Sequence, residues 1–150
     1  MNVDLPPRFH ERLAADCPDA VIYADATGYI HYWNAAATRI FGFEEGEAVG
    51  MRLDLIIPER LRSRHWEGYD KVIGGARSRY GEGAILAVPA VTKDGRRISV
   101  EFTILPLHNE PGALLGIIAF LRDMTTRFEE VRALRRELAA LKGEIEQRRR

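Results

Sequence analysis

His65 is the residue whose type and surroundings could do chemistry in this sequence. It belongs to a series spaced four, four and three residues apart: Leu61, His65, Tyr69 and Val72. Residues with this spacing share one face of a helix, which is predicted to run from about Pro58 to Gly74-Gly75. An imidazole on an apolar face is either a core side chain with a hydrogen-bond partner or a ligand for something held against that face. The first alternative predicts a module that only transmits a signal, and the second predicts a sensor.

The other polar residues form no catalytic or metal-binding pattern. His10, His31 and His108 fall in a terminal helix, a strand and a loop, and no two histidines have the spacing of metal ligands on one helix. Asp25 and Asp94 are predicted to belong to turns, where aspartate is common. No nucleophile with a neighbouring base and no placed pair of carboxylates is visible, so the sequence does not predict an enzyme.

The composition predicts one soluble domain with an extension. The chain has 150 residues, 46% of them hydrophobic, and its net charge of zero gives no support for binding to nucleic acid or to a membrane surface. A single cysteine, Cys17, excludes an internal disulfide. No apolar run approaches the roughly 20 residues of a membrane-spanning helix, and no signal-peptide pattern is present. We therefore expect a cytoplasmic protein that spans no membrane.

The order of predicted elements is two strands, several short helices and then three strands. This order is typical of an α+β fold in which helices cover one face of an antiparallel sheet. Glycines 74, 75, 81 and 83 lack the pattern of a phosphate-binding loop and are predicted to form a connection. The strands are predicted at residues 20–24, 29–33, 84–92, 97–107 and 114–121.

The last 26 residues differ in kind from the rest of the chain. Apolar residues recur at intervals of three, four, three and four, which is a heptad pattern: Val131, Leu134, Leu138, Leu141 and Ile145. The pattern loses one residue of phase near Phe128. Two alternatives follow, namely a dimeric coiled coil and an amphipathic helix that folds back on its own sheet. Two heptads are too short for an independent coiled coil, but they could suffice when attached to a dimerising domain.

Five segments of the sequence resemble, in order and spacing, the landmarks of PAS domains. They are residues 25–34, which include Trp33-Asn34, Phe41-Gly42-Phe43 with Glu47 and Gly50, Ile57-Pro58, Lys93-Asp94-Gly95, and residues 120–125. The resemblance implies the PAS fold, a five-stranded antiparallel sheet whose concave face encloses a ligand pocket together with the helices. It also implies three regions: a helical lead-in at 1–16, a sensory domain at 17–124, and a signalling and dimerisation helix at 125–150.

The segment around His65 is similar to one subgroup of this family. Residues 62–69, Arg-Ser-Arg-His-Trp-Glu-Gly-Tyr, resemble the proximal-histidine motif of the haem-binding oxygen sensors, with one extra residue between histidine and glycine. The resemblance implies that His65 is the axial ligand of a b-type haem. Leu86 stands where rhizobial oxygen sensors carry a distal arginine. Leucine cannot donate a hydrogen bond to oxygen, so carbon monoxide, nitric oxide or a redox change is the more natural input.

The pocket implied by this resemblance has a set of expected lining residues: Leu61, His65, Trp66, Tyr69, Leu86, Ile104 and Ile118. Two alternatives to haem remain, a cofactor-free interaction module with His65 in its core and a redox sensor with noncovalent flavin. The cysteine motif of flavin photosensors that form a cysteinyl adduct is missing. Expected partners are a second copy of the chain, a downstream signalling protein in trans, and a small or diatomic ligand.

Overall fold

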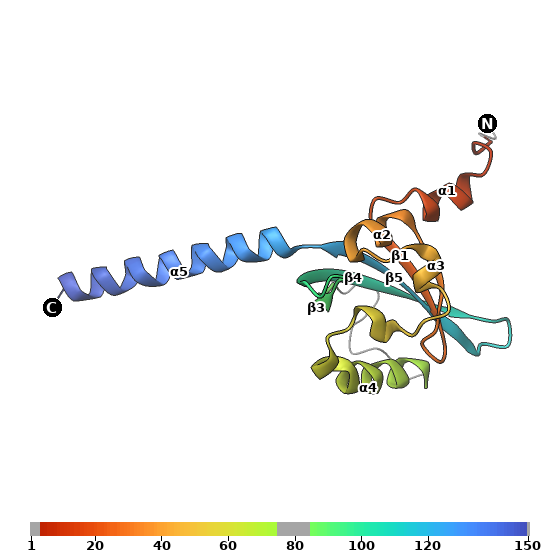
Figure 1. The fold of residues 1–150 in the computed structure, drawn as a ribbon. Helices are drawn as coiled ribbons and strands as arrows, with labels where there is room; N and C mark the ends of the chain where they lie inside the picture. Colours follow the sequence, from red (N-terminus) through yellow and green to blue (C-terminus); the bar gives the residue numbers. More distant parts are fainter. Residues whose placement is uncertain (1–3, 75–84, 150) are drawn as a thin grey trace.

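Both halves of the sequence contribute strands to one antiparallel sheet of order β2-β1-β5-β4-β3 (Figure 1). The computed structural model describes residues 4–74 and 85–149. The predicted α+β architecture is confirmed, whereas glycines 75, 81 and 83 and the predicted start of the third strand at Ala84 lie outside the described residues. The strands are β1 (Ala20–Asp25), β2 (Ile30–Trp33), β3 (Leu86–Val91), β4 (Arg97–His108) and β5 (Leu114–Asp123).

The helices lie between β2 and β3 and at the two ends of the chain (Figure 1). The helix expected from about Pro58 is divided, because a turn of 3-10 helix precedes its regular part. None of the helices in the described residues is long and apolar enough to cross a membrane. The helical elements are α1 (Phe9–Ala15), α2 (Ala35–Phe41), α3 (Glu45–Ala48), the 3-10 turns η1 (Leu53–Ile56) and η2 (Glu59–Leu61), α4 (Arg62–Ile73) and α5 (Thr125–Arg148).

The core lies between one face of the sheet and the short helices. Trp33 and Phe41 are its largest fully buried side chains, with ring centroids 5.6 Å apart. The indole N–H of Trp33 donates to the carbonyl of Phe43 at 3.0 Å, so this buried ring leaves no polar atom unpaired. From the sheet, alternate residues of β1, β4 and β5 complete the core, among them Ile22, Ile98, Val100 and Leu121.

Asn34 joins the start of the domain to its helical layer. Its buried side chain accepts hydrogen bonds from the backbone N–H groups of Val21 and Ala37, each at 3.0 Å. The second of these bonds caps α2. Its amide donates to the carbonyls of Ala14 and Asp19, also at 3.0 Å each. One side chain therefore holds the end of α1, the start of β1 and the first turn of α2 together.

Helix α5 extends away from the sheet as a single projecting rod (Figure 1). It contains no buried residue, and the apolar side chains of its heptad pattern are 39 to 63% exposed. At its start, Met124 N–H donates to the carbonyl of Ser99 at 2.8 Å, and Ser99 N–H donates to the Thr125 hydroxyl at 3.0 Å. The helix is thus fixed to β4 at its root, and it does not fold back on its own sheet.

Candidate functional site

Helix α4, which carries His65, is attached to the η1 segment and to the end of β1. The Trp66 indole N–H donates to the Asp54 carboxylate at 2.7 Å. The Arg62 guanidinium donates to the backbone carbonyl of Asp54, in the same segment, at 3.3 Å. The Tyr69 hydroxyl donates to the carbonyls of Ala24 at 3.3 Å and Asp25 at 2.5 Å. These hydrogen bonds within the protein are enough to hold α4 in its position.

The Trp66 ring lies against the turn between β1 and β2. Gly28 in that turn has φ of +86°, and a Cβ added there would overlap the six-membered part of the Trp66 ring. The Arg52 guanidinium lies 4.1 Å from the centroid of the same ring, which is within the range of a cation–π interaction. Trp66 therefore packs between the turn and Arg52, so its role in the described structure is to fasten α4.

His65 has a buried nitrogen without a partner. Its ring centroid lies 4.8 Å from that of Trp66 and 5.8 Å from that of Tyr69. Among the side chains of the described residues, its Nδ1 is the one buried polar atom with no hydrogen bond. Burial lowers the pKa of His65, and Arg52 lowers it further, against an opposing effect of Asp54. The ring is therefore neutral at pH 7, which is the state in which imidazole binds a metal.

The turn between β1 and β2 holds a network centred on Asp25. Its carboxylate accepts hydrogen bonds from Thr27, from the Tyr29 N–H at 3.1 Å and from His31 Nε2 at 2.6 Å. Burial raises the pKa of Asp25, but the hydrogen bonds outweigh this and lower it to about 2. Burial and the nearby Asp25 charge raise the pKa of Tyr69. Tyr69 therefore stays protonated and remains a donor to the backbone.

The strand register decides which sheet residues can belong to a pocket with α4. Leu86 lies opposite Phe102 and Ile104 lies opposite Ala119, and both half-buried side chains share the face that carries the core. Ile118 lies opposite Tyr23 in β1 and Leu105 in β4, on the other face. The prediction for Ile118 therefore needs correction. Leu61, half-buried, ends η2 directly before α4.

The surface of the domain has two pockets that no sequence pattern indicated. One, of about 410 Å³, lies next to the contact between Arg52 and Trp66. It is lined by Tyr29, by residues 50–52 before η1, by Asp54 and Leu55 of η1, and by Arg62 at the start of α4. Among the described residues, no group of three or more histidine, cysteine, aspartate or glutamate side chains could hold a metal ion.

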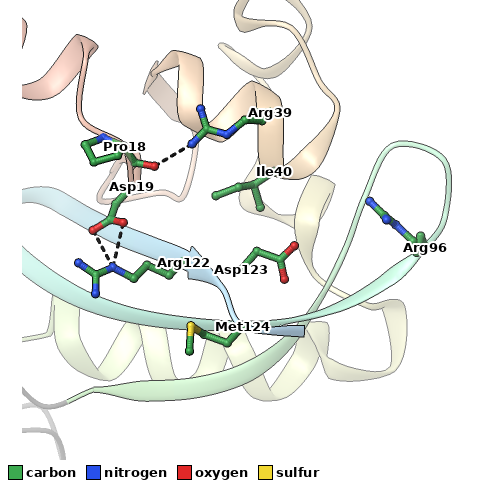
Figure 2. Close-up of a pocket in the computed structure, with 8 residues that line it drawn as sticks. All are labelled: Pro18, Asp19, Arg39, Ile40, Arg96, Arg122, Asp123 and Met124. Atoms are coloured by element: carbon green, nitrogen blue, oxygen red, sulfur yellow. Dashed lines mark hydrogen bonds and ion pairs between the residues drawn. The ribbon is translucent and has the colours of Figure 1, made fainter. Parts of the chain in front are cut away.

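The other pocket, of about 400 Å³, lies where β5 ends and α5 begins (Figure 2). The Arg122 guanidinium donates through Nε to both carboxylate oxygens of Asp19 at 2.9 Å, and Arg39 donates to the Pro18 carbonyl at 2.8 Å. Both contacts hold the segment before β1 against the end of β5 and the α2 helix. The start and the end of the sheet domain thus meet at the root of α5.

Comparison with known sequences gives one family. The sequence model described as the PAS fold matches residues 15–129. The sensor protein FixL of Bradyrhizobium diazoefficiens is 32% identical over 113 residues, which cover 72% of this chain and 21% of FixL. The oxygen sensor protein DosP of Escherichia coli is 25% identical over 112 residues, or 75% of this chain and 14% of DosP. The matched part of the chain therefore spans only 14 to 21% of the length of these relatives.

Solved structures show the same fold at low sequence identity. The PAS domain of a Colwellia psychrerythraea protein has a TM-score of 0.66 at 18% identity, covering 78% of this chain and 95% of that one. An RNA-binding light-oxygen-voltage receptor has a TM-score of 0.69 at 22% identity, covering 96% of this chain and 40% of that one. Each of these similarities concerns the architecture of the sheet and its helices.

Proposed function

Because the chain belongs to the PAS-fold family, we propose that it is a sensory module that holds a b-type haem through His65. PAS domains are sensory modules of signal transduction, and the sequence around His65 resembles the proximal motif of the haem-binding members. The similarity to FixL, a sensor protein, and to DosP, an oxygen sensor, supports this proposal. The proposed input is carbon monoxide, nitric oxide or a redox change.

The observation that carries the proposal is the unpartnered Nδ1 of His65. A buried polar atom without a partner destabilises a fold by about 1–3 kcal/mol, and such atoms are rare in folded proteins. A neutral imidazole with an unsatisfied nitrogen fits a ligand for iron, because coordination needs a free lone pair. The burial that keeps the ring neutral also excludes the water that would otherwise satisfy it.

The residues proposed to hold the haem come from the helical segment η2–α4 and from the strands β3 and β4. His65 would be the axial ligand, with Leu61 and Tyr69 beside it on the same helical segment. Trp66, which was also expected to line the pocket, packs against Gly28 and Asp54 instead. Leu86 and Ile104 would supply the apolar surface from the sheet, since they share its core face. A bound haem supplies an iron that takes a diatomic ligand or changes oxidation state. Leu86 offers no hydrogen-bond donor to such a ligand, which disfavours stable oxygen binding.

The proposed output is a change in α5 of a homodimer, passed to a signalling protein in trans in the cytoplasm. Tyr69 bonds α4 to the end of β1, and β1 pairs along its length with β5, which continues into α5. The Asp19–Arg122 contact joins the segment before β1 to the end of β5. These contacts support a route from the pocket to the projecting helix.

A visible spectrum of the full chain, purified from cells supplied with haem, tests the proposal. We expect a Soret band that is lost in His65→Ala and retained in the matched control His108→Ala, whose side chain is exposed on β4. Circular dichroism shows whether each variant has kept its fold. A colourless folded protein, or a Soret band indifferent to His65→Ala, refutes haem ligation by this residue.

A cofactor-free interaction module is the second candidate, and one observation favours it. The Trp66–Asp54 and Tyr69–Asp25 hydrogen bonds fasten α4 without any ligand. In that case His65 is a packed aromatic side chain between Trp66 and Tyr69. A colourless protein with the thermal stability of a folded domain, unaltered by added haem, supports this candidate.

A further inference from the structure

We propose that the pocket beside Trp66 and the start of α4 binds a small organic monocarboxylate, whose carboxylate group is held by Arg52 and Arg62. The ligand carries an uncharged hydrocarbon body, aromatic or aliphatic, in addition to this one acidic group. The pocket shares no lining residue with the set proposed to hold haem, so its ligand is a second one, separate from the proposed sensory input.

The Arg52 guanidinium is held by aromatic contacts and keeps its hydrogen-bond donors available. Its Cζ lies 4.1 Å from the centroid of the Trp66 ring and 6.0 Å from that of the Tyr29 ring. Among the described residues, its side chain forms no ion pair and no hydrogen bond. A guanidinium that stacks on a ring presents its N–H groups along its edge, where two of them match the two oxygens of a carboxylate. Arg52 is therefore oriented before any ligand binds.

The charged groups of the pocket leave room for one negative charge. Arg62 donates through Nε to the Ile57 carbonyl at 3.2 Å and through Nη2 to the Asp54 carbonyl at 3.3 Å, which fixes its guanidinium at the pocket wall. The Asp54 carboxylate accepts from the Trp66 indole N–H at 2.7 Å and lies 4.0 Å from Arg62 Nε. Two guanidiniums and one carboxylate give the lining an excess of one positive charge, which a monoanion balances.

The remaining side chains of the pocket are apolar, and two of them are exposed. Tyr29 and Met51 are 44 and 49% exposed, and Leu55 is half-buried. A hydrocarbon body bound against them would remove this apolar surface from water, which an inorganic anion would leave exposed. Pockets for small molecules combine such a surface with a few placed polar groups and have volumes of about 300–1,000 Å³. The volume of about 410 Å³ found here lies in that range.

The two tryptophans of the chain allow binding to be located. The Trp66 indole N–H donates to Asp54 in the pocket lining, whereas Trp33 is fully buried and its N–H donates to the Phe43 carbonyl. A proton–nitrogen correlation spectrum of the full chain, purified without added haem, gives one indole signal for each ring, and Trp66→Phe assigns them. Titration with benzoate or hexanoate at constant ionic strength should shift the Trp66 signal saturably and leave the Trp33 signal in place.

Variants of Arg52 test which group recognises the carboxylate. Arg52→Gln should raise the dissociation constant at least about tenfold, because it removes hydrogen bonds between charged groups. Arg52→Lys keeps the charge but loses the fork of N–H groups, so its affinity should lie between the two. Arg60→Gln is the matched control: it removes the same charge from an exposed residue of η2 outside the pocket lining, and should stay within about twofold of the original. Circular dichroism shows whether each variant has kept its fold.

The neutral analogue benzamide should give no saturable shift, because it has the ring of benzoate without its charge. Binding of benzoate alone or of hexanoate alone supports the site and identifies the body that it accepts. The site is refuted if neither carboxylate shifts the Trp66 signal saturably at up to about 20 mM, a range that covers weak binding of molecules of this size. Equal effects of Arg52→Gln and Arg60→Gln, or equal binding of benzamide, also overturn it. A Soret band, present or absent, has no bearing on these results.

Discussion

Gly28→Ala tests whether the Trp66 ring packs against the turn between β1 and β2. Gly28 has φ of +86°, and an added Cβ would overlap that ring. The positive φ alone costs about 1–2 kcal/mol for a non-glycine residue. Forcing an extra carbon into a packed site adds about 1–3 kcal/mol. We therefore expect a loss of about 2–5 kcal/mol in the free energy of unfolding, a large part of the 5–15 kcal/mol typical of a domain.

Urea unfolding followed by tryptophan fluorescence measures this loss. Gly46→Ala is the matched control, because Gly46 lies in a helix, has no atom within 4 Å of an added Cβ and does not have a positive φ. We expect that control to be neutral or to stabilise by about 0.5–1 kcal/mol. In a Trp66→Ala background, the cost of Gly28→Ala should fall to the backbone part, about 1–2 kcal/mol. Equal costs in both backgrounds would refute the packing of Trp66 on the turn.

Three further changes probe the site. In colourless protein, His65→Leu should raise the free energy of unfolding by about 1 kcal/mol, because it removes an unpaired buried nitrogen. The original protein should lose stability below pH 6.5, because the unfolded imidazole takes up a proton that the buried ring resists. His65→Leu should remove this pH-dependent loss. The Asp25 carboxylate, with its pKa lowered to about 2, stabilises the fold only while it is ionised, so the original protein should lose about 1 kcal/mol as the pH falls from about 5 toward 2. Asp25→Asn should abolish this loss. Acid titration followed by circular dichroism measures it. Asn34→Ala should lower the free energy of unfolding, measured in urea, by about 2–4 kcal/mol, because it removes the α2 cap and leaves buried backbone groups without a hydrogen-bond partner. An equal loss for Asn109→Ala, at an exposed position, would contradict this.

The fold was predictable because its local patterns agree with its packing. Asn34 and Gly42 mark both ends of α2 in the sequence, and the structure places them at its caps, with Gly42 at φ of +84°. Alternation along β4 gives the buried face, with Ile98 and Val100 in the core. These positions depend on near neighbours in the chain, which is why the sequence alone indicates them.

The site was less predictable because it depends on distant contacts. Alternation cannot assign a face to Ile118, since β5 is apolar on both faces from Ile117 to Leu121. Nothing in the spacing indicates that Trp66 turns toward Gly28 and Asp54 rather than toward the pocket. The Asp19–Arg122 contact joins residues 103 positions apart, and no local pattern reports such a pair.

In the proposed sensor, the anchoring of α4 would let one helix both hold a ligand and act on α5. A residue that binds a ligand has no effect on a distant helix unless its own position is tied to the sheet. His65 lies one turn before Tyr69, whose hydroxyl bonds the carbonyl of Asp25 at the end of β1. Because β1 pairs with β5 from Ala20 to Asp25, a shift of α4 would strain the strand that continues into α5. Tyr69→Phe should therefore weaken the effect of ligand binding at His65 on the dimer dissociation constant, while binding and dimerisation themselves persist. An unchanged effect in that variant would mean that the signal passes from the ligand to α5 by another route.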